Sequence, residues 1–393
     1  MENIKSIANK IRKEGGTLYL VGGAVRDSLL GKETHDKDYC VTGITFEKFQ
    51  EIFPEAHIRG KAFSVFDIDG KEFALARTES KLGKGHKEFE INVDSKITIE
   101  EDLARRDITI NAIAKEVLTG KIIDPFKGQE DLKNKIIRAT TEHFKEDPLR
   151  VYRVARFAAQ LNFEVEENTI KQMTELKEEL NTLSNERVFT ELSKALNTKK
   201  PSKFFNVLRN ADVLDVHFKE IKNLIGAEQP PKYHPEGNVL NHVLMVVDKA
   251  SQVKHKSEYP LAFMWAALLH DIGKLTTTKI RKGRITSYNH DNEGEDISKE
   301  MLDKLTDDEE LKYQISKLVR YHMQPLFFDK NLPFFTFEDM INDIDYKEVA
   351  LLSSCDRLGR GQMTSLDKER ELNNIKNFKK YCKDIERRNK WNY

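Results

Sequence analysis

The spacing of apolar residues changes partway along the chain. Residues 17–23 predict a buried strand that ends in a double-glycine turn, and a short helix closed by Gly31 should follow. Another strand is expected at residues 36–43, and apolar alternation on both sides of Asp69-Gly70 is typical of a tight hairpin. The first part of the chain therefore indicates an α+β fold, in which strands and helices are mixed.

The second part has a different pattern. Apolar residues recur there at three- and four-residue spacing, which predicts amphipathic helices at residues 150–161, 169–180 and 186–196. The rest of the chain is expected to be nearly all helical. Because proline cannot continue a helix and keeps the preceding residue extended, residues 200–202 (KPS) and 229–231 (QPP) are predicted linkers.

Composition limits the classes of function. With 393 residues and 39% apolar content the chain can form two or three ordinary cores. A formal net charge of zero argues against a surface devoted wholly to nucleic acid. Two local basic clusters either permit RNA binding or are solvated helix faces. They are Lys194, Lys199, Lys200, Lys203 and Arg209, and Lys379, Lys380, Lys383, Arg387 and Arg388.

Cysteine spacing and hydropathy indicate the compartment. Cys40, Cys355 and Cys382 lie far apart without CxxC spacing, so neither a disulfide framework nor a thiolate zinc site is suggested. The first 16 residues lack the apolar core of a signal peptide, and no later apolar run is long enough to span a bilayer. We therefore expect a cytoplasmic protein that has no contact with membranes.

Glycines and paired carboxylates form the first candidate site. Gly22-Gly23 would let a backbone approach a phosphate at a helix N-terminus, where Arg26 adds a charged donor. An ordinary tight turn is the alternative. Asp36 and Asp38 follow at strand alternation, which predicts that both carboxylates point to one face of the sheet. Such a pair is unfavourable unless cations bridge it, and two Mg2+ ions are the usual solution in nucleotidyl transfer.

Further acidic residues lie nearby in the sequence. Asp67 and Asp69 have the same spacing as the first pair, but we interpret them as hairpin-turn residues without a catalytic role. Glu72 either supplies a third carboxylate or is an exposed strand glutamate. The two pairs differ in that only the first follows a glycine turn and a helix.

Two arginine-rich segments complete the first candidate site. Arg105, Arg106, Asp107 and Asn111 form a polar group beside an apolar run, and arginine forks suit phosphate oxygens. Further along, an aspartate and an arginine three residues apart would share a helical face.

The second segment pairs Asp147 with Arg150. An aspartate can accept from the exocyclic amine of cytosine or adenine while an arginine donates to the adjacent ring acceptor, a combination that suits neither uracil nor guanine. The protein itself would then be the template. The alternative is an N-capping aspartate followed by a solvated arginine stripe.

Six segments match a known family in order and spacing. They are LVGGAVRDSLLG, DKD, EFALARTE, DLARRDITINAIA, DPFKGQEDL and EDPLRVYRVARFAAQLNF. Together they resemble the class II tRNA nucleotidyltransferase and poly(A) polymerase family, and the chain looks most like the HD-containing bacterial CCA proteins within it.

The resemblance implies roles for particular residues. Asp36 and Asp38 are implied to be the catalytic pair that binds magnesium. Triphosphate binding for ATP or CTP falls to Gly23, Arg26 and Arg106. Base reading falls to Asp147 and Arg150, and the nucleotide pocket is completed by Arg153 and Arg156.

The helical half contains a second candidate site around His270-Asp271 in ALLHDIGK, with Gly273 as a helix stop. A core histidine is the alternative, but burying this ring beside an aspartate after AFMWAALL carries a desolvation cost. The order His, His-Asp, Asp resembles the metal core of the HD phosphohydrolase superfamily. The matching residues are His242, His270, Asp271 and Asp356, with His290 and His322 where extra histidines complete a second metal site. His290 lies in an acidic neighbourhood, so a surface position is the alternative for it.

These patterns and resemblances predict an ordered series of domains. They are a mixed-sheet nucleotidyltransferase head at residues 1–139, a helical base-recognition neck at 140–200, a helical body at 201–231, an all-helical HD phosphohydrolase domain at 232–362 and a helical tail at 363–393.

The implied function is addition of C, C and A to the 3′ end of tRNA. The tRNA 3′-hydroxyl attacks CTP twice and ATP once, with Mg2+ as cofactor. The HD domain is implied to be a 2′,3′-cyclic phosphodiesterase, 2′-nucleotidase and phosphatase that uses a divalent transition metal such as Ni2+ or Mn2+. The alternatives are a poly(A) polymerase, a CC-adding or A-adding enzyme, or an HD phosphohydrolase with a nucleotide-sensing head. The sequence leaves both a monomer and a homodimer open.

Overall fold

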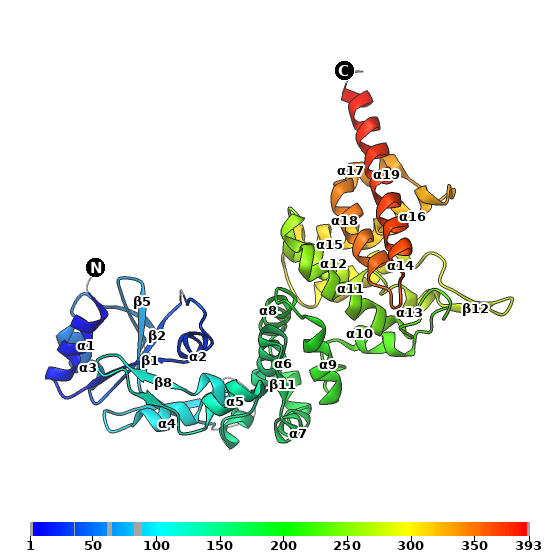
Figure 1. Ribbon diagram of the computed structural model, residues 1–393. Coiled ribbons are helices and arrows are strands. Elements are labelled where there is room, and N and C mark those ends of the chain that lie inside the picture. The colour runs from blue at the N-terminus through cyan, green and yellow to red at the C-terminus, as the bar shows by residue number, and fades with distance from the viewer. Residues whose placement is uncertain (1–2, 35, 61–64, 82–88, 391–393) are drawn as a thin grey trace. The chain divides into compact units, whose positions relative to one another are not determined.

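The computed structural model describes residues 3–34, 36–60, 65–81 and 89–390. The chain forms two compact units, Met1–Leu183 and Ser184–Tyr393. The first unit contains the large sheet and the second is mainly helical (Figure 1). The boundary between the units falls inside the predicted neck, and the finer division into head, neck, body and tail stays a prediction.

A mixed seven-stranded sheet forms the first unit, in the order β3-β4-β5-β2-β1-β8-β9. Strand β2 runs antiparallel to β1 and parallel to β5. The strands of this sheet are β1 Thr17–Val21, β2 Asp38–Thr42, β3 His57–Gly60, β4 Val65–Ile68, β5 Lys71–Leu75, β8 Ala114–Glu116 and β9 Ile122–Ile123. Two further pairs are β6 Arg77–Lys81 with β7 Phe89–Val93, and β10 Ile136–Ile137 with β11 Glu164–Val165.

Alternation along β2 gives the sheet two apolar faces. Tyr39 and Val41 are buried in one core, whereas Cys40 is buried in the other. Helices α1 and α3 contribute to the first core and α4 to the second. The helices of this unit are α1 Ile4–Lys13, α2 Gly23–Leu29, α3 Phe46–Ile52, α4 Ile99–Ala104, α5 Gly128–Asn134, α6 Leu149–Leu161 and α7 Glu167–Glu175, with short 3-10 turns η2 Thr109–Asn111, η3 Glu142–Glu146 and η4 Glu178–Thr182.

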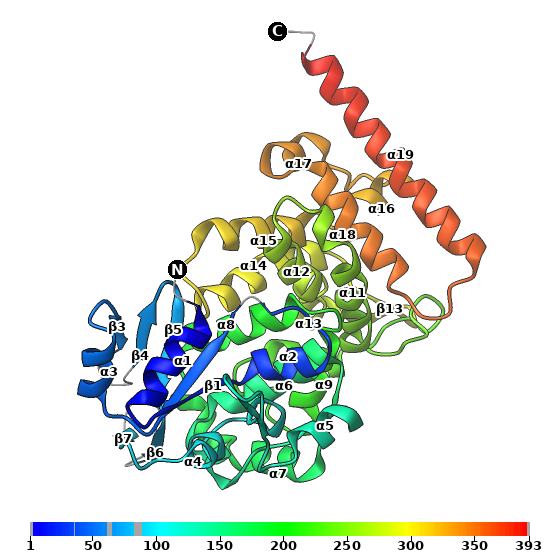
Figure 2. The same ribbon diagram turned by 60° about the vertical axis from the view of Figure 1, so that its left-hand side comes forward.

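The second unit packs its helices around the apolar helix α12, which is buried along nearly its whole length. Its helices are α8 Asn185–Leu196, α9 Ser202–Asn210, α10 Lys219–Asn223, α11 Val239–Val253, α12 Pro260–Leu269, α13 Lys274–Thr277, α14 His290–Asp303, α15 Glu309–Tyr321, α16 Gln324–Asp329, α17 Phe337–Asp343, α18 Tyr346–Leu358 and α19 Ser365–Lys390, with 3-10 turns η5 Leu224–Gly226 and η6 Lys254–Lys256. The long C-terminal helix α19, red in Figure 2, packs against α16 and α18.

The structure confirms the predicted strand, glycine turn and short helix at the start of the sheet. It also confirms the hairpin of β4 and β5, whose turn residues Asp69 and Gly70 have φ of 51° and 76°. One predicted helix is too long, because α7 ends at Glu175 and residues 178–182 form a 3-10 turn. Acidic residues at that point, such as Glu178, are unfavourable at a helix C-terminus.

The helical part also contains a hairpin that the helical pattern did not predict. Strands β12 Lys279–Arg281 and β13 Arg284–Thr286 pair antiparallel between α13 and α14. Lys282 and Gly283, with φ of 49° and 71°, form the left-handed turn that a two-residue hairpin requires. In the described ranges, no helix is long and apolar enough to cross a membrane.

Candidate functional sites

Carboxylates gather where β2 begins in the first unit. Asp38 is the first residue of β2, and the parallel register places Glu72 of β5 beside it. Asp36 lies two residues before the strand, which begins later than predicted, so the expectation that both carboxylates point to one face stays a prediction. Burial raises the pKa of the Asp38 carboxyl; Arg106 opposes this shift, while Glu72 and Asp36 add to it. Glu72 and Asp36 therefore repel the Asp38 carboxylate, and a bound cation would relieve this repulsion.

Arg59 partly balances this charge. Its guanidinium lies 3.0 Å from the Glu72 carboxylate and 2.7 Å from that of Asp67. The Asp67 carboxylate also accepts a hydrogen bond of 3.1 Å from the Gly70 N–H, which fits its predicted role in the hairpin turn.

The glycine turn approaches an arginine closely. Gly22 has φ of 69°, and a Cβ placed on it would lie 3.0 Å from Nη1 of Arg106. Arg106 Nη2 is 3.1 Å from the buried carboxylate of Asp102, and its Nε is buried without a hydrogen-bond partner among the described residues. This guanidinium therefore retains donor capacity beside the turn, as phosphate binding would need.

Arg26 begins a buried polar network. Its Nε and Nη2 each donate to the Asp27 carboxylate at 2.9 Å, and Nη1 donates to Asn111 Oδ1 at 2.7 Å. Asn111 in turn donates to Asp107 at 3.2 Å, and Arg153 lies 2.7 Å from the same aspartate. Burial raises the pKa of Asp107, but Arg153 and Asn111 outweigh it and lower the pKa to about 2. Asp107 is therefore an ionised centre that orients Arg153.

Three of the predicted arginines surround one aromatic ring that the sequence interpretation missed. The guanidinium carbons of Arg26, Arg153 and Arg156 lie 5.3, 5.6 and 4.0 Å from the centroid of the Phe157 ring. Phe157 is buried on α6. The only local signal was its position after two arginines spaced three apart on the same helix.

Asp147 and Arg150 lie at the start of α6. The Asp147 carboxylate accepts from the Leu149 N–H at 3.0 Å, as the helix-capping interpretation expects. Arg150 is buried and donates to the carbonyls of His143 and Arg105, the latter at 2.6 Å, so it does not belong to a solvated stripe. Its side chain is held beside the segment that carries Arg106, and base reading by this pair stays a prediction.

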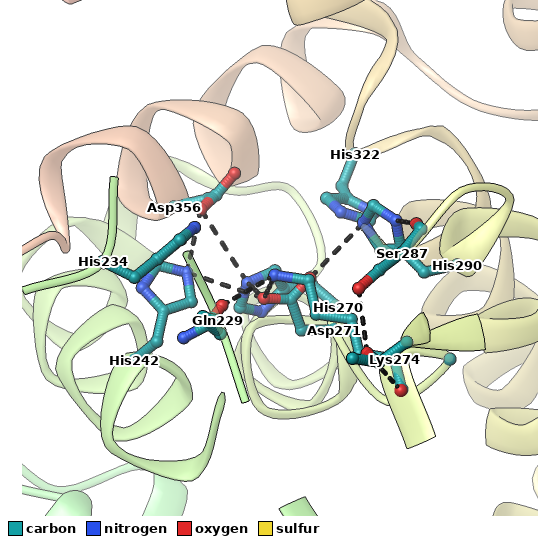
Figure 3. Close-up of polar contacts among 12 residues, drawn as sticks. Gln229, His234, His242, His270, Asp271, Lys274, Ser287, His290, His322 and Asp356 are labelled. Carbon is teal, nitrogen blue, oxygen red and sulfur yellow. Dashed lines mark hydrogen bonds and ion pairs between the residues drawn. The ribbon is translucent and has the colours of Figure 1, made fainter. Parts of the chain in front are cut away.

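Histidines and aspartates from five segments converge in the second unit (Figure 3). All of them are buried, including His290, for which a surface position had been the alternative. They are His242 on α11, His270 and Asp271 after α12, His290 at the start of α14, His322 after α15 and Asp356 on α18.

The Nε2 atoms of the histidines point to the carboxylates at the centre. His242 Nε2 lies 3.0 Å from Asp356 Oδ1 and 3.7 Å from Asp271 Oδ2. His270 Nε2 is 3.4 Å from Asp271 Oδ2, and His290 Nε2 is 3.4 Å from Asp271 Oδ1. Two potential metal groups thus share Asp271, one with His242 and His270 and the other with His290 and His322.

The opposite ring nitrogens fix the histidine orientations. Nδ1 of His270, His290 and His322 each lies 2.7–3.0 Å from a backbone carbonyl oxygen. A carbonyl can only accept, so each Nδ1 carries the proton and each Nε2 presents a lone pair. These three Nε2 atoms are buried without a hydrogen-bond partner among the described residues. Imidazole with carboxylate suits divalent transition metals, so the donor set fits such an ion.

Electrostatics favour neutral His290 and His322 beside an ionised Asp271. Burial lowers the pKa of His242, but Asp356 and Glu236 outweigh it and raise that pKa. Burial lowers the pKa of His322 to about 4, and neighbouring His290 and His270 contribute to the shift. Burial raises the pKa of Asp271, but Lys274 and the histidines outweigh it and hold that pKa well below the usual range. Neutral His290 and His322 and an ionised Asp271 are the protonation states that metal binding requires.

Supporting residues around this cluster were not predicted from the sequence. Glu236 Oε1 lies 2.9 Å from Nδ1 of both His242 and His234. Lys274 Nζ is 2.7 Å from Asp271 and 2.9 Å from Gln229 Oε1. The available signals were the HPEG sequence upstream of His242 and the lysine three residues after Asp271, which one helical turn brings back to it.

Three family matches follow the chain in order. Residues 18–138 match the poly A polymerase head domain, residues 162–225 the probable RNA and SrmB-binding site of polymerase A, and residues 239–349 the HD domain. Fold and matches together define a nucleotidyltransferase head joined to an HD domain.

Relatives that match about two thirds or more of the chain narrow this class. The chain is 40% identical over 317 residues to a multifunctional CCA protein of Actinobacillus pleuropneumoniae serotype 5b (strain L20), which covers 78% of this chain and 75% of the relative. It is 45% identical over 270 residues to one of Paraburkholderia phymatum, covering 66% and 63%. The chain therefore belongs to the multifunctional CCA protein family and is a nucleotidyltransferase with an HD domain.

Solved structures support the same fold. The Bacillus stearothermophilus CCA-adding enzyme in complex with CTP matches with a TM-score of 0.60 and 21% identity, over 95% of this chain and 81% of that chain. A tRNA nucleotidyltransferase complexed with a primer tRNA and an incoming ATP analog matches with a TM-score of 0.62 and 22% identity, over 97% and 99%.

Proposed function

We propose that this chain adds C, C and A to the 3′ end of tRNA from CTP and ATP. The 3′-hydroxyl attacks the α-phosphate, the bond to the β-phosphate breaks and pyrophosphate leaves. The observation that carries the proposal is the gathering of Asp36, Asp38 and Glu72 near Arg106. Desolvation raises the pKa of the Asp38 carboxyl, and the two neighbouring carboxylates add to this shift while Arg106 opposes it. Mg2+ held by Asp36 and Asp38 would activate the hydroxyl and neutralise charge on the triphosphate.

The arginines around the glycine turn and α6 would bind the nucleotide. Arg106 suits the triphosphate, because its Nη1 lies close to Gly22 and its Nε has no hydrogen-bond partner among the described residues. Gly23 is the first residue of α2, so its N–H belongs to the helix terminus that faces an incoming anion. Arg26 and Arg153 are held by Asp27 and Asp107, so they would contact the nucleotide in fixed orientations.

Base selection would fall to the start of α6. Asp147 and Arg150 are anchored to the backbone on either side of the helix start, and Arg156 lies against Phe157. A rigid donor and acceptor pair of this kind favours cytosine and adenine over uracil and guanine.

For the histidine cluster we propose a metal-dependent phosphohydrolase, acting as a 2′,3′-cyclic phosphodiesterase, 2′-nucleotidase and phosphatase. Support comes from the convergence on Asp271 of buried Nε2 atoms that have no hydrogen-bond partner in the described part of the chain. A divalent metal such as Mn2+ or Ni2+ at this cluster would supply an activated water. His242, His270 and Asp356 would hold one ion, and His290 and His322 the other, with Asp271 between them.

The first test supplies a tRNA transcript lacking its CCA with Mg2+ and with CTP, ATP or both. A product three nucleotides longer only with both nucleotides supports the proposal. Long A tails would indicate a poly(A) polymerase, and addition of only CC or only A would indicate a partial enzyme. Absence of any extension would leave an HD phosphohydrolase with a nucleotide-sensing head.

Two variants separate the sites. Asp36→Ala with Asp38→Ala should abolish nucleotide addition and leave hydrolysis of 2′,3′-cyclic AMP unchanged. His270→Ala should do the reverse. Loss of both activities in either variant would contradict the assignment of the two reactions to separate sites.

A further inference from the structure

The hairpin of β12 and β13 is a strongly basic segment beside the histidine cluster. Residues 274–288 contain Lys274 and four further lysines or arginines but no acidic residue, although the whole chain has 65 basic and 65 acidic residues. The hairpin projects from the body of the second unit (Figure 1).

Its positive charges share one face. Arg281 lies directly opposite Arg284 in the strand register, and Lys279 is two residues before Arg281, so the three side chains point the same way. All three are exposed, as is Lys282 at the turn, and none of the four forms an ion pair with the part of the chain that the structure describes. Like charges directly opposite one another destabilise a strand pair, so this arrangement suits an external anion better than the hairpin itself.

Exposed aromatic and apolar groups accompany the charge. The Tyr288 side chain is 67% exposed and that of Ile280 is 75% exposed. The Arg281 guanidinium lies 5.0 Å from the centroid of the Tyr288 ring. A basic strip with an exposed ring is the combination that binds single-stranded nucleic acid, because phosphates pair with the cations and a base stacks on the ring.

Both ends of the hairpin are fixed at the histidine cluster. Thr278 and Ser287 hydroxyls hydrogen bond across its base at 2.8 Å, and the Ser287 carbonyl accepts from Nδ1 of His290 at 2.8 Å. Lys274, at the other end, contacts Asp271 (Figure 3). Anything bound along the basic face therefore lies on an element that ends at the metal ligands.

We propose that this hairpin binds the 3′-terminal strand of an RNA and presents its terminal phosphate to the histidine cluster. The inference rests on the proposed phosphohydrolase function and adds its substrate class, an RNA end in place of a free nucleotide. Lys279, Arg281 and Arg284 hold successive backbone phosphates, and Tyr288 stacks on a base.

The test compares two substrates of the full-length protein with Mn2+. One is a single-stranded RNA oligonucleotide that ends in a 2′,3′-cyclic phosphate, and the other is 2′,3′-cyclic AMP. Lys279→Gln, Arg281→Gln and Arg284→Gln together should raise KM for the oligonucleotide about 10- to 100-fold near 0.1 M salt, because each single-strand phosphate contact contributes a salt slope of about 0.7. The kcat for the oligonucleotide and both constants for cyclic AMP should stay within about twofold of those of the parent protein.

Two matched variants control for charge. Lys379→Gln, Lys380→Gln and Lys383→Gln remove the same charge from exposed positions of α19 and should leave the KM for RNA unchanged. Lys279→Arg, Arg281→Lys and Arg284→Lys together keep the hairpin charge, so this variant should have the KM for RNA of the parent protein. An equal rise in KM for both substrates, or the same effect from the α19 variant, would overturn the proposal.

Crosslinking separates failure of the inference from failure of the proposed hydrolase. A 4-thiouridine at the 3′ end of the oligonucleotide should crosslink to residues 279–288 of the unmodified protein and much less to the triple glutamine variant. Crosslinking there without hydrolysis would refute the hydrolase and support the hairpin as an RNA site. Hydrolysis without crosslinking to the hairpin would refute the inference alone.

Discussion

Gly273 should tolerate no side chain, because the backbone of another helix occupies the space. A Cβ on Gly273 would lie 2.0 Å from the carbonyl oxygen of His290 and 2.6 Å from the N–H nitrogen of Gly294. The φ of Gly273 is −66°, so alanine would suffer no backbone strain, and the close approach is the whole reason for glycine. Gly273→Ala therefore has to push the start of α14 away.

The size of the effect follows from the contact. Reaching even a tight 3.0 Å separation requires a shift of about 1 Å, and overpacking of this kind costs about 1–3 kcal/mol. Because the neighbour is backbone, we expect the upper half of that range, or roughly 4–12 °C in melting temperature for a unit of this length. The same shift carries His290 away from Asp271, so metal affinity at that group should fall about 10- to 100-fold.

Tryptophan fluorescence can follow the melt, since Trp265 is buried in α12 of the second unit. Calorimetric titration with Mn2+ reports the metal sites. Gly226→Ala is the matched control, because nothing lies within 4 Å of its Cβ position and both parameters should remain at parental values. If Gly273→Ala melts and binds Mn2+ as Gly226→Ala does, the argument from close approach is refuted. Nucleotide addition should persist in both variants.

Other predictions concern charge and metal. The pKa of Asp107 is lowered to about 2 in the folded protein, so the ionised carboxylate stabilises the fold by about 2 kcal/mol. This contribution is complete above about pH 4 and is lost as the pH falls through 2. Hydrogen exchange of head peptides should show this loss in the parent protein, whereas Asp107→Asn should be less stable at neutral pH and lack the acid transition. Glu236→Gln removes the charge beside His242 and should weaken metal binding, measured by titration, about 10- to 100-fold. Glu228→Gln, at an exposed position, should leave metal affinity unchanged. EDTA should lower the melting temperature of the second unit by roughly 5–10 °C, because a metal present at 100 times its Kd adds about 2.7 kcal/mol to the free energy of unfolding. Added metal should reverse the change. Equal melting temperatures with and without EDTA would exclude a contribution of the metal to stability.

Local features of the fold were predictable because they depend on neighbouring residues alone. The turn at Gly22 and the hairpin at Asp69-Gly70 each need a left-handed backbone, which few residue types adopt. The end of α7 and the hairpin around Lys282 were not predicted, although Lys282-Gly283 carries the same kind of turn signal. Its flanking residues are largely charged, so the apolar alternation that reveals β4 and β5 is absent.

The chemistry of the first site was less predictable than its composition. The sequence pointed to Arg26 and Arg153 as phosphate or nucleotide contacts, but it could not show that Asp27 and Asp107 engage them. Asn111 hydrogen bonds to both Arg26 and Asp107. It lies 85 residues after Arg26 in the sequence, so only the fold brings the two side chains together. A pairing between distant segments leaves no periodic trace in either one.

The ring orientations of three histidines in the cluster are set by backbone carbonyls at the ends of their own helices. His270 and His322 follow the last residues of their helices, and each hydrogen bonds to the carbonyl three residues earlier, which has no partner within the helix. His290 begins α14 and uses a carbonyl that precedes the helix.

His242 lies inside α11, where backbone carbonyls accept from the N–H four residues later, so no local acceptor is free to orient its ring. A side chain from outside the helix has to do this, and Glu236 does. The carboxylate upstream of His242 is therefore needed because of where that histidine lies in its helix, and the same reasoning explains why the other three histidines have no such partner.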